Sequence, residues 1–129
     1  MNKDLLSLSI GYIDFMSNVG ALPNLEDYES YSSSIFSDNV SKIENGKCIL
    51  EGLTALMEQL RNARAFAFPW AIKVLDVLCD KEKNCSALRF SWDSEKVGLH
   101  ITTAILQFDS NGKILEIKEV YNRFADITH

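Results

Sequence analysis

The sequence predicts a single α+β domain that spans residues 1–129. Up to residue 68, apolar residues recur mainly at the three- and four-residue spacing of helices. Beyond that point, strand-like stretches alternate with short polar turns. We therefore expect the helices to cover one face of an antiparallel sheet, because an apolar sheet face must be buried. A chain of this length can bury a core without disulfides or metals.

Three helices and a short hairpin are predicted in the first half of the chain. The first helix covers about 5–19, and Gly20 is placed to end it. The second opens at Pro23, and the third covers about 51–65. The predicted face of the second helix carries Leu25, Tyr28, Ser32 and Ile35. Residues 40–50 are typical of a hairpin around a central Asn-Gly pair.

Four strands are predicted in the second half, at 70–79, 86–92, 99–108 and 114–124. The last two form a long hairpin around the sequence Asp-Ser-Asn-Gly at 109–112, whose Asn-Gly supplies the positive backbone angles of a tight turn. Consecutive strands joined by short turns form an antiparallel meander.

The charge balance argues against a nucleic-acid binder. The formal net charge is -5 and the isoelectric point is about 5.0, so the basic footprint of a phosphate-backbone partner is missing. No stretch approaches the roughly 20 apolar residues of a membrane span, and the first residues lack a signal-peptide pattern. We therefore expect a cytoplasmic protein with neither a nucleic-acid nor a membrane partner.

The cysteines and histidines do not form a metal-binding pattern. Cys48, Cys79 and Cys85 are odd in number and have no C-x-x-C spacing, so we expect neither a disulfide framework nor a zinc site. Cys79 and Cys85 flank a polar turn and could face each other, but a cytoplasmic compartment would keep them reduced. No metal and no cofactor is predicted.

Four short segments carry a resemblance to a known family: Tyr12-Ile13-Asp14-Phe15, Phe36-Ser37-Asp38, Gly52 and the stretch 108–114. In this order and spacing, over nearly the whole chain, the sequence resembles the nuclear transport factor 2-like superfamily, which includes SnoaL-like polyketide cyclases and ketosteroid isomerases. The resemblance implies a cystatin-like α+β roll. In such a roll, a cone-shaped, curved, largely antiparallel but mixed sheet wraps three N-terminal helices and leaves an apolar pocket at the open end.

The resemblance also implies candidate catalytic positions. Ketosteroid isomerase moves a proton with a carboxylate base, beside an oxyanion hole made by a tyrosine and a protonated aspartic acid. The family's tyrosine falls on Tyr12. Its base falls on Glu44 when counted from 36–38, and on Ile43 when counted back from Gly52. Its second oxyanion donor falls on Ala104, which has no proton to donate, so steroid isomerisation itself is not expected.

Further pocket positions follow from the strand period and from the aromatic residues. His100, Thr102 and Ala104 share one face of the predicted strand at 99–108. The family's aromatic pocket wall falls on Tyr121. Trp92 and Phe108 are interpreted as wall or core aromatics.

Each candidate has a structural alternative beside the functional one. Glu44 could be a buried base, or a solvated residue at a hairpin tip. His100 could act as an acid, a base or a ligand, or could simply pack within the sheet. Asp76 interrupts an apolar strand face, either as a functional carboxylate or as an edge residue that reaches solvent.

Two functions from different classes fit this sequence. The first is a SnoaL-like pocket protein that binds a small apolar or cyclic molecule, with isomerase- or cyclase-type acid-base chemistry by Tyr12, Glu44 and His100. The second is a non-catalytic, ligand-sequestering or interaction module that forms a homodimer through its sheet. Apolar residues on both faces of the last strands favour burial of both faces.

Overall fold

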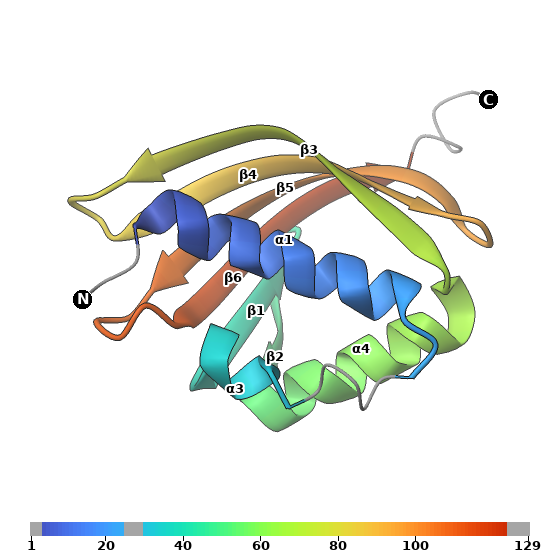
Figure 1. Ribbon diagram of the computed structural model, residues 1–129, viewed down its shortest axis with the longest axis horizontal. Helices are drawn as coiled ribbons and strands as arrows, with labels where there is room; N and C mark the ends of the chain where they lie inside the picture. The colour runs from blue at the N-terminus through green and yellow to red at the C-terminus, as the bar shows by residue number, and fades with distance from the viewer. Residues whose placement is uncertain (1–3, 25–29, 124–129) are drawn as a thin grey trace.

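The computed structural model describes residues 4–24 and 30–123. Its helices and strands follow the predicted order, with helices first and the meander last (Figure 1). They are α1 (Leu5–Ala21), α3 (Ser32–Ile35), β1 (Phe36–Glu44), β2 (Lys47–Glu51), α4 (Leu53–Ala67), β3 (Trp70–Asp80), β4 (Cys85–Ser94), β5 (Gly98–Phe108) and β6 (Ile114–Arg123).

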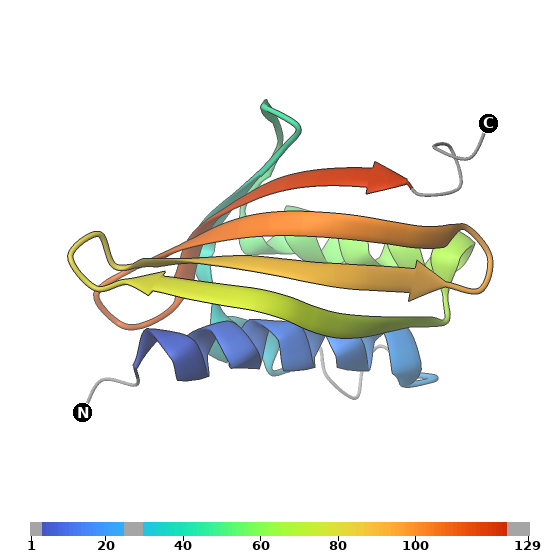
Figure 2. The ribbon, with the colours of Figure 1, turned by 90° about the horizontal axis from the view of Figure 1, so that it is seen from above.

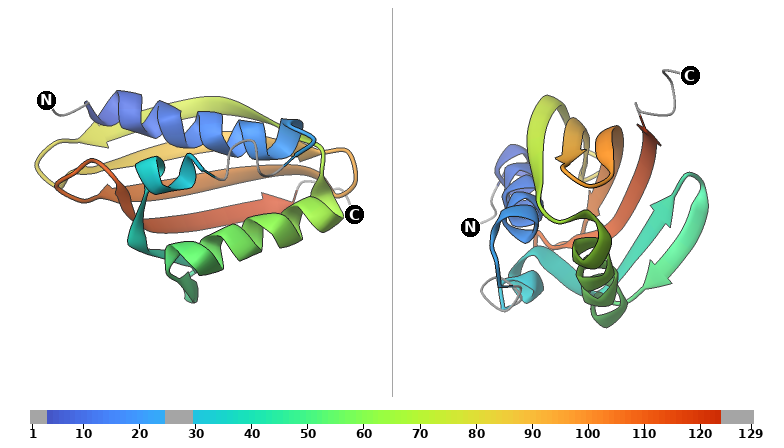
Figure 3. Two further views of the ribbon diagram at one scale, coloured as in Figure 1. Left: turned by 60° about the horizontal axis from the view of Figure 1, so that its bottom comes forward. Right: turned by 90° about the vertical axis from the view of Figure 1, so that its right-hand side faces the viewer.

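The six strands form one mixed sheet in the order β2-β1-β6-β5-β4-β3 (Figure 2). All neighbouring pairs are antiparallel except β1 and β6, which run parallel. The sheet curves around α1 and α4 without closing on itself (Figure 3). Register shifts in β1, β3 and the β5-β6 pair contribute to the curvature, because a bulge bends its strand. The predicted α+β roll with a curved mixed sheet is confirmed.

The core lies between α1, α4 and the concave face of the sheet. In α1, Leu5, Tyr12, Phe15 and Val19 are buried at helical spacing, and Tyr12 and Phe15 meet Phe36 edge to face at ring-centroid distances of 6.2 and 5.3 Å. The other fully buried large side chains come mainly from the strands: Leu88, Leu106, Ile114 and Ile117. The helical period of α1 and the two-residue period of the strands therefore meet in one apolar layer.

The junction between α1 and α4 corrects the expected role of Gly20. The helix continues to Ala21, so Gly20 lies inside α1, where an added Cβ would collide with the indole of Trp70. That indole donates a hydrogen bond to the carbonyl oxygen of Met16 at 3.1 Å. Arg64 of α4 donates to the carbonyl oxygens of Val19 and Leu22 at 2.6 and 2.7 Å, groups that the end of α1 leaves without helical partners. The end of α1 is thereby fixed against both β3 and α4.

One local prediction lies partly outside the described residues, and another needs correction. Of the second predicted helix, Leu25 and Tyr28 lie outside the described residues; Pro23 itself is not helical, and Ser32 and Ile35 belong to the one-turn helix α3 (Ser32–Ile35). The turn at 109–112 has a positive φ at Gly112 alone, and the Asp109 carboxylate accepts the backbone N–H groups of Asn111 and Lys113. The true Asn-Gly turn with two positive φ angles is Asn45-Gly46, at 50° and 85°.

The structure also shows the surroundings of the three cysteines and of Asp76. Cys79 pairs with Ser86 and Cys85 with Asp80, so the two thiols are not cross-strand neighbours, and all three cysteines are free. Asp76 is an exposed residue of the edge strand β3 and forms an ion pair with Arg89 at 2.9 Å. No helix in the described part of the chain is long and apolar enough to cross a membrane.

Candidate functional site

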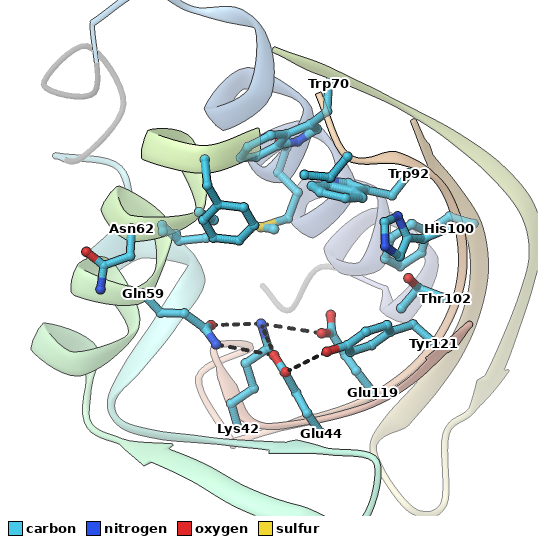
Figure 4. A pocket seen from close by; sticks show the side chains of 16 residues that line it. Lys42, Glu44, Gln59, Asn62, Trp70, Trp92, His100, Thr102, Glu119 and Tyr121 are labelled. Atoms are coloured by element: carbon cyan, nitrogen blue, oxygen red, sulfur yellow. Dashed lines mark hydrogen bonds and ion pairs between the residues drawn. The ribbon is translucent and has the colours of Figure 1, made fainter. Parts of the chain in front are cut away.

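A cavity of about 570 Å³ opens between α4 and the concave face of the sheet. Figure 4 shows polar side chains at one end and aromatic rings at the other. The lining residues are Met16, Lys42, Glu44, Gln59, Leu60, Asn62, Ala63, Phe66, Trp70, Phe90, Trp92, Val97, His100, Thr102, Glu119 and Tyr121. A volume of this size is within the range of about 300 to 1,000 Å³ that small-molecule sites usually show.

The polar end is organised around the ammonium group of Lys42. Its Nζ donates to Gln59 Oε1 at 2.9 Å and forms ion pairs with Glu44 Oε2 at 3.2 Å and Glu119 Oε1 at 3.3 Å. These three contacts match the three protons of an ammonium group. Lys42 is only 6% exposed, so this charge is held inside the protein.

Strand pairing brings the two carboxylates together. Glu44 lies opposite Glu119 in the parallel pairing of β1 with β6, and the N–H of Asn45 donates to the carbonyl oxygen of Glu119 at 2.8 Å. Like charges directly opposite each other destabilise a sheet. The Lys42 ammonium, two residues before Glu44 in β1, compensates this repulsion.

Further hydrogen bonds fix each carboxylate. Tyr12 donates to Glu119 Oε2 at 3.1 Å, and the Gln59 side-chain amide donates to Glu44 Oε2 at 3.2 Å. Tyr121 donates to Glu44 Oε1 at 3.4 Å. The side chain of Glu119 is 9% exposed and that of Glu44 is 19% exposed. Glu44 is therefore the carboxylate that a ligand in the cavity would meet first.

The cluster also sets the protonation of its neighbours. Burial alone would lower the pKa of Lys42, but Glu119 and Glu44 outweigh it and hold that pKa above its ordinary value. Lys42 therefore stays an ammonium ion near neutral pH, a fixed cation and not a nucleophile. Burial, followed by the charge of Glu119, raises the pKa of Tyr12 well above its usual range. Burial and then Glu44 raise the pKa of Tyr121.

A row of rings extends from the apolar end of the cavity along four neighbouring strands, from β3 to β6. Trp70 and Trp92 lie 5.4 Å apart between ring centroids, Trp92 and His100 lie 4.8 Å apart, and His100 and Tyr121 lie 6.2 Å apart. Phe66 of α4 is 59% exposed at the same cavity. The row leads from the apolar end to the phenol that contacts Glu44, so a ligand could touch rings and carboxylate at once.

Most of the predicted site residues reach this cavity. Glu44, Trp92, His100, Thr102 and Tyr121 line it. Of the two positions counted for the base, Glu44 is in the lining; Ile43, the other, is not. Placement in the cavity leaves the proposed catalytic roles as predictions.

Three of the predicted site residues are placed differently. Tyr12 is 1% exposed and lies behind Glu119, outside the lining, so it joins the site only through that carboxylate. Ala104 and Phe108 are core residues and not pocket walls, with 0% and 3% exposure. They occupy the part of β5 beyond Thr102, where the side chains of the core fill the concave face.

Sequence reasoning missed Lys42, Gln59 and Glu119. Glu119 lies between Ile117 and Tyr121 at strand spacing, so a charge stands at an inward-facing position of β6. Lys42 interrupts the inward face of β1 in the same way.

Ala104 is the direct cross-strand partner of Glu119. The acid that the isomerase pattern expects at position 104 is therefore absent, and a carboxylate stands on the neighbouring strand.

The described residues contain no group of three or more histidine, cysteine or acidic side chains that could hold a metal ion. No family model and no curated protein matches the chain.

Solved structures, in contrast, match its fold closely. A SnoaL-like polyketide cyclase from Agrobacterium tumefaciens superposes with a TM-score of 0.72 at 15% identity, over 98% of this chain and 98% of its own. The chain has the NTF2-like, SnoaL-like fold. An NTF2-like protein of unknown function from Exiguobacterium has a TM-score of 0.70 at 18% identity, over 92% of this chain and 98% of its own. A protein with a cystatin-like fold from Methylobium petroleophilum has a TM-score of 0.73 at 13% identity, over 94% of this chain and 79% of its own.

The buried cluster predicts an alkaline loss of stability. Tyr12 and Lys42 keep their protons to higher pH in the folded than in the unfolded protein, since the pKa of each is raised by folding. Above about pH 10 the unfolded chain releases these protons first, so the free energy of unfolding falls by up to about 1.4 kcal/mol per pH unit for each group. Below the unfolded pKa values the full contribution is present.

Urea denaturation between pH 7 and 11 measures this effect. The variant Tyr12→Phe should show a shallower alkaline decline than the wild type. The control Tyr31→Phe, at a side chain that is 61% exposed, should follow the wild type. Identical slopes for Tyr12→Phe and the wild type would contradict the assignment of the decline to Tyr12.

Proposed function

We propose that the chain binds a small apolar or cyclic molecule in this cavity and carries out acid-base chemistry of the isomerase or cyclase type on it. The observation that carries the proposal is the position of Glu44. Its partly accessible carboxylate is held by Lys42, Gln59 and Tyr121 at one end of a ring-lined cavity of about 570 Å³. An apolar cavity with a few convergent polar groups is the usual form of a small-molecule site.

In this proposal Glu44 accepts a proton from a hydroxyl or amine group of the bound molecule as that group adds to a carbonyl carbon of the same molecule; the C=O π bond breaks and the carbonyl oxygen takes up a proton. Two carboxylates face one ammonium in the cluster, so proton uptake by Glu44 removes an excess negative charge. Tyr12 contributes indirectly, by holding Glu119 against Lys42. His100, on the aromatic row, is the proton donor or acceptor at the other side of the ligand.

The fold comparison supports the class of this proposal. A structural neighbour is named a SnoaL-like polyketide cyclase, and the same scaffold surrounds the cavity here. A fold alone does not assign a reaction, so the site residues carry the argument.

Ligand binding can be measured with the protein's own fluorescence. The chain has two tryptophans, Trp70 and Trp92, and both line the cavity. A neutral probe such as 4-phenyl-1-butanol, which does not absorb at the excitation wavelength of tryptophan, should change their emission in a saturable way. In the variant Ala63→Phe, a larger side chain fills the cavity and binding should weaken at least tenfold. Ala65→Phe, at an exposed position of the same helix outside the lining, is the matched control. Equal affinities of the two variants would contradict binding in this cavity.

The acid-base half has its own test. On any substrate that the wild type turns over, Glu44→Gln should lower kcat by about a hundredfold, because the amide cannot accept the proton. Its affinity for the neutral probe should change less than twofold, since the amide keeps the shape of the carboxylate. Full activity of Glu44→Gln would remove Glu44 from the chemistry.

A second candidate is a homodimer through the convex face of the sheet. Leu78, Ile105 and Val120 expose 72%, 44% and 59% of their surface there, and Leu78 and Ile105 both flank Ala87 in one row across three strands. Exposed apolar side chains in a row favour association, and a second copy presents the same face.

Sedimentation measures this association directly. Wild-type protein at micromolar concentration should sediment as a dimer, and Ile105→Lys should shift it to the monomer, because the buried ammonium would be unpaired. A monomeric wild type at that concentration would contradict the homodimer.

A further inference from the structure

The polar end of the cavity has an excess of negative charge. Glu44 and Glu119 provide two carboxylates, whereas Lys42 is the single lysine or arginine among the described lining residues. This cluster lies in a largely apolar wall, where charges are screened less than in water. The site is therefore electrostatically more favourable for a cationic ligand than for an anionic one.

Lys42 is not available to bind an anion. Its ammonium already contacts Gln59, Glu44 and Glu119 within 3.3 Å. A ligand carboxylate or phosphate would have to displace one of these contacts and would then lie beside two like charges. Such a ligand loses both a hydrogen bond and electrostatic energy on entry.

Glu44, by contrast, can accept another hydrogen bond. Its Oε1 receives the Tyr121 hydroxyl at 3.4 Å, a longer contact than any that reaches Glu119. A carboxylate oxygen has more than one lone pair, so a donor from the cavity could approach Oε1 more closely. Hydrogen bonds that involve charged partners are shorter and stronger than neutral ones.

The aromatic row suits a cation attached to an apolar body. Tyr121 contacts Glu44 and also stands at one end of the row that continues to Trp92 and Trp70. Ring faces attract ammonium groups, and the rings give an apolar body a surface to pack on. Carboxylate and rings therefore recognise two parts of one molecule.

We infer that the cavity selects ligands in which a basic nitrogen is attached to an apolar or cyclic body, with the protonated nitrogen donating to Glu44. This inference rests on the proposed binding function and names its ligand class.

Three probes that differ in one end group test the inference: 4-phenylbutylamine, 4-phenyl-1-butanol and 4-phenylbutyrate. Each is titrated into the wild type at pH 7, with selective excitation of Trp70 and Trp92. The amine should bind at least tenfold more tightly than the alcohol, and the carboxylate more weakly than the alcohol. This ranking is measured on the unmodified protein and requires no variant to fold.

A matched pair of variants locates the preference. Glu44→Gln should bring the affinity for the amine to within about threefold of that for the alcohol. Glu58→Gln, at an exposed position of α4 outside the lining, should keep the wild-type ranking. Circular dichroism of both variants checks that they are folded.

The outcomes separate the inference from the proposed function. If the alcohol binds but the amine binds no more tightly, or the carboxylate binds best, the inference is overturned and the pocket function stands. An amine preference that survives unchanged in folded Glu44→Gln also overturns it. If none of the three probes binds, the proposed function fails and the inference fails with it.

Discussion

The arrangement of the site depends on the contacts of the Lys42 ammonium group. Parallel pairing of β1 with β6 sets Glu44 against Glu119, and the ammonium lies between them at 3.2 and 3.3 Å. The same group binds Gln59 of α4, and Glu119 in turn accepts the Tyr12 hydroxyl of α1. One charge therefore links both helices that pack on the concave face to the one parallel pair of the sheet. Without it, the strand register that closes the polar end of the cavity would bring two carboxylates together unbalanced.

Burial of the charged cluster around Lys42 carries a large desolvation penalty. A buried ion pair costs several kcal/mol of desolvation for each ion, and well-packed apolar residues in its place are often as stable or more so. The surrounding core of α1, α4 and the strands already supplies the burial that folding requires. Buried charged groups gathered at the wall of a cavity are a usual feature of functional sites. The cost of the cluster is therefore itself an argument for a chemical role.

The sequence predicted those parts of the molecule that depend on local periodicity. Helix α1, the four strands after residue 68 and the Asn45-Gly46 hairpin each follow from spacing or turn chemistry within about 20 residues. The encounter of Glu44 with Glu119 could not be predicted in this way. It depends on β1 joining the sheet beside β6, about 70 residues away, and on the exact register of that parallel pair. The sequence shows Lys42 and Glu119 as charged residues at inward-facing strand positions. It does not show that they contact each other and Glu44. The resemblance assigned Tyr12 to the site by its sequence position alone. The sequence could not show that the Glu119 side chain lies between Tyr12 and the cavity.

The pair formed by Ala104 and Glu119 explains why the chemistry of this cavity should differ from that of an oxyanion hole. A small side chain at position 104 leaves room for the carboxylate opposite it on β6, where Tyr12 and Lys42 reach it. Both oxygens of Glu119 accept hydrogen bonds, one from a phenol and one from an ammonium, which is the pattern of an ionised carboxylate and not of a neutral donor. The Tyr12 proton is engaged in the same contact, so neither group is free to stabilise negative charge on a ligand. In the proposed reaction, the net charge of the cluster would instead favour a bound group on which positive charge develops before Glu44 takes its proton. An acid at position 119 in place of one at position 104 would therefore, in the proposed site, favour positive rather than negative charge on the ligand.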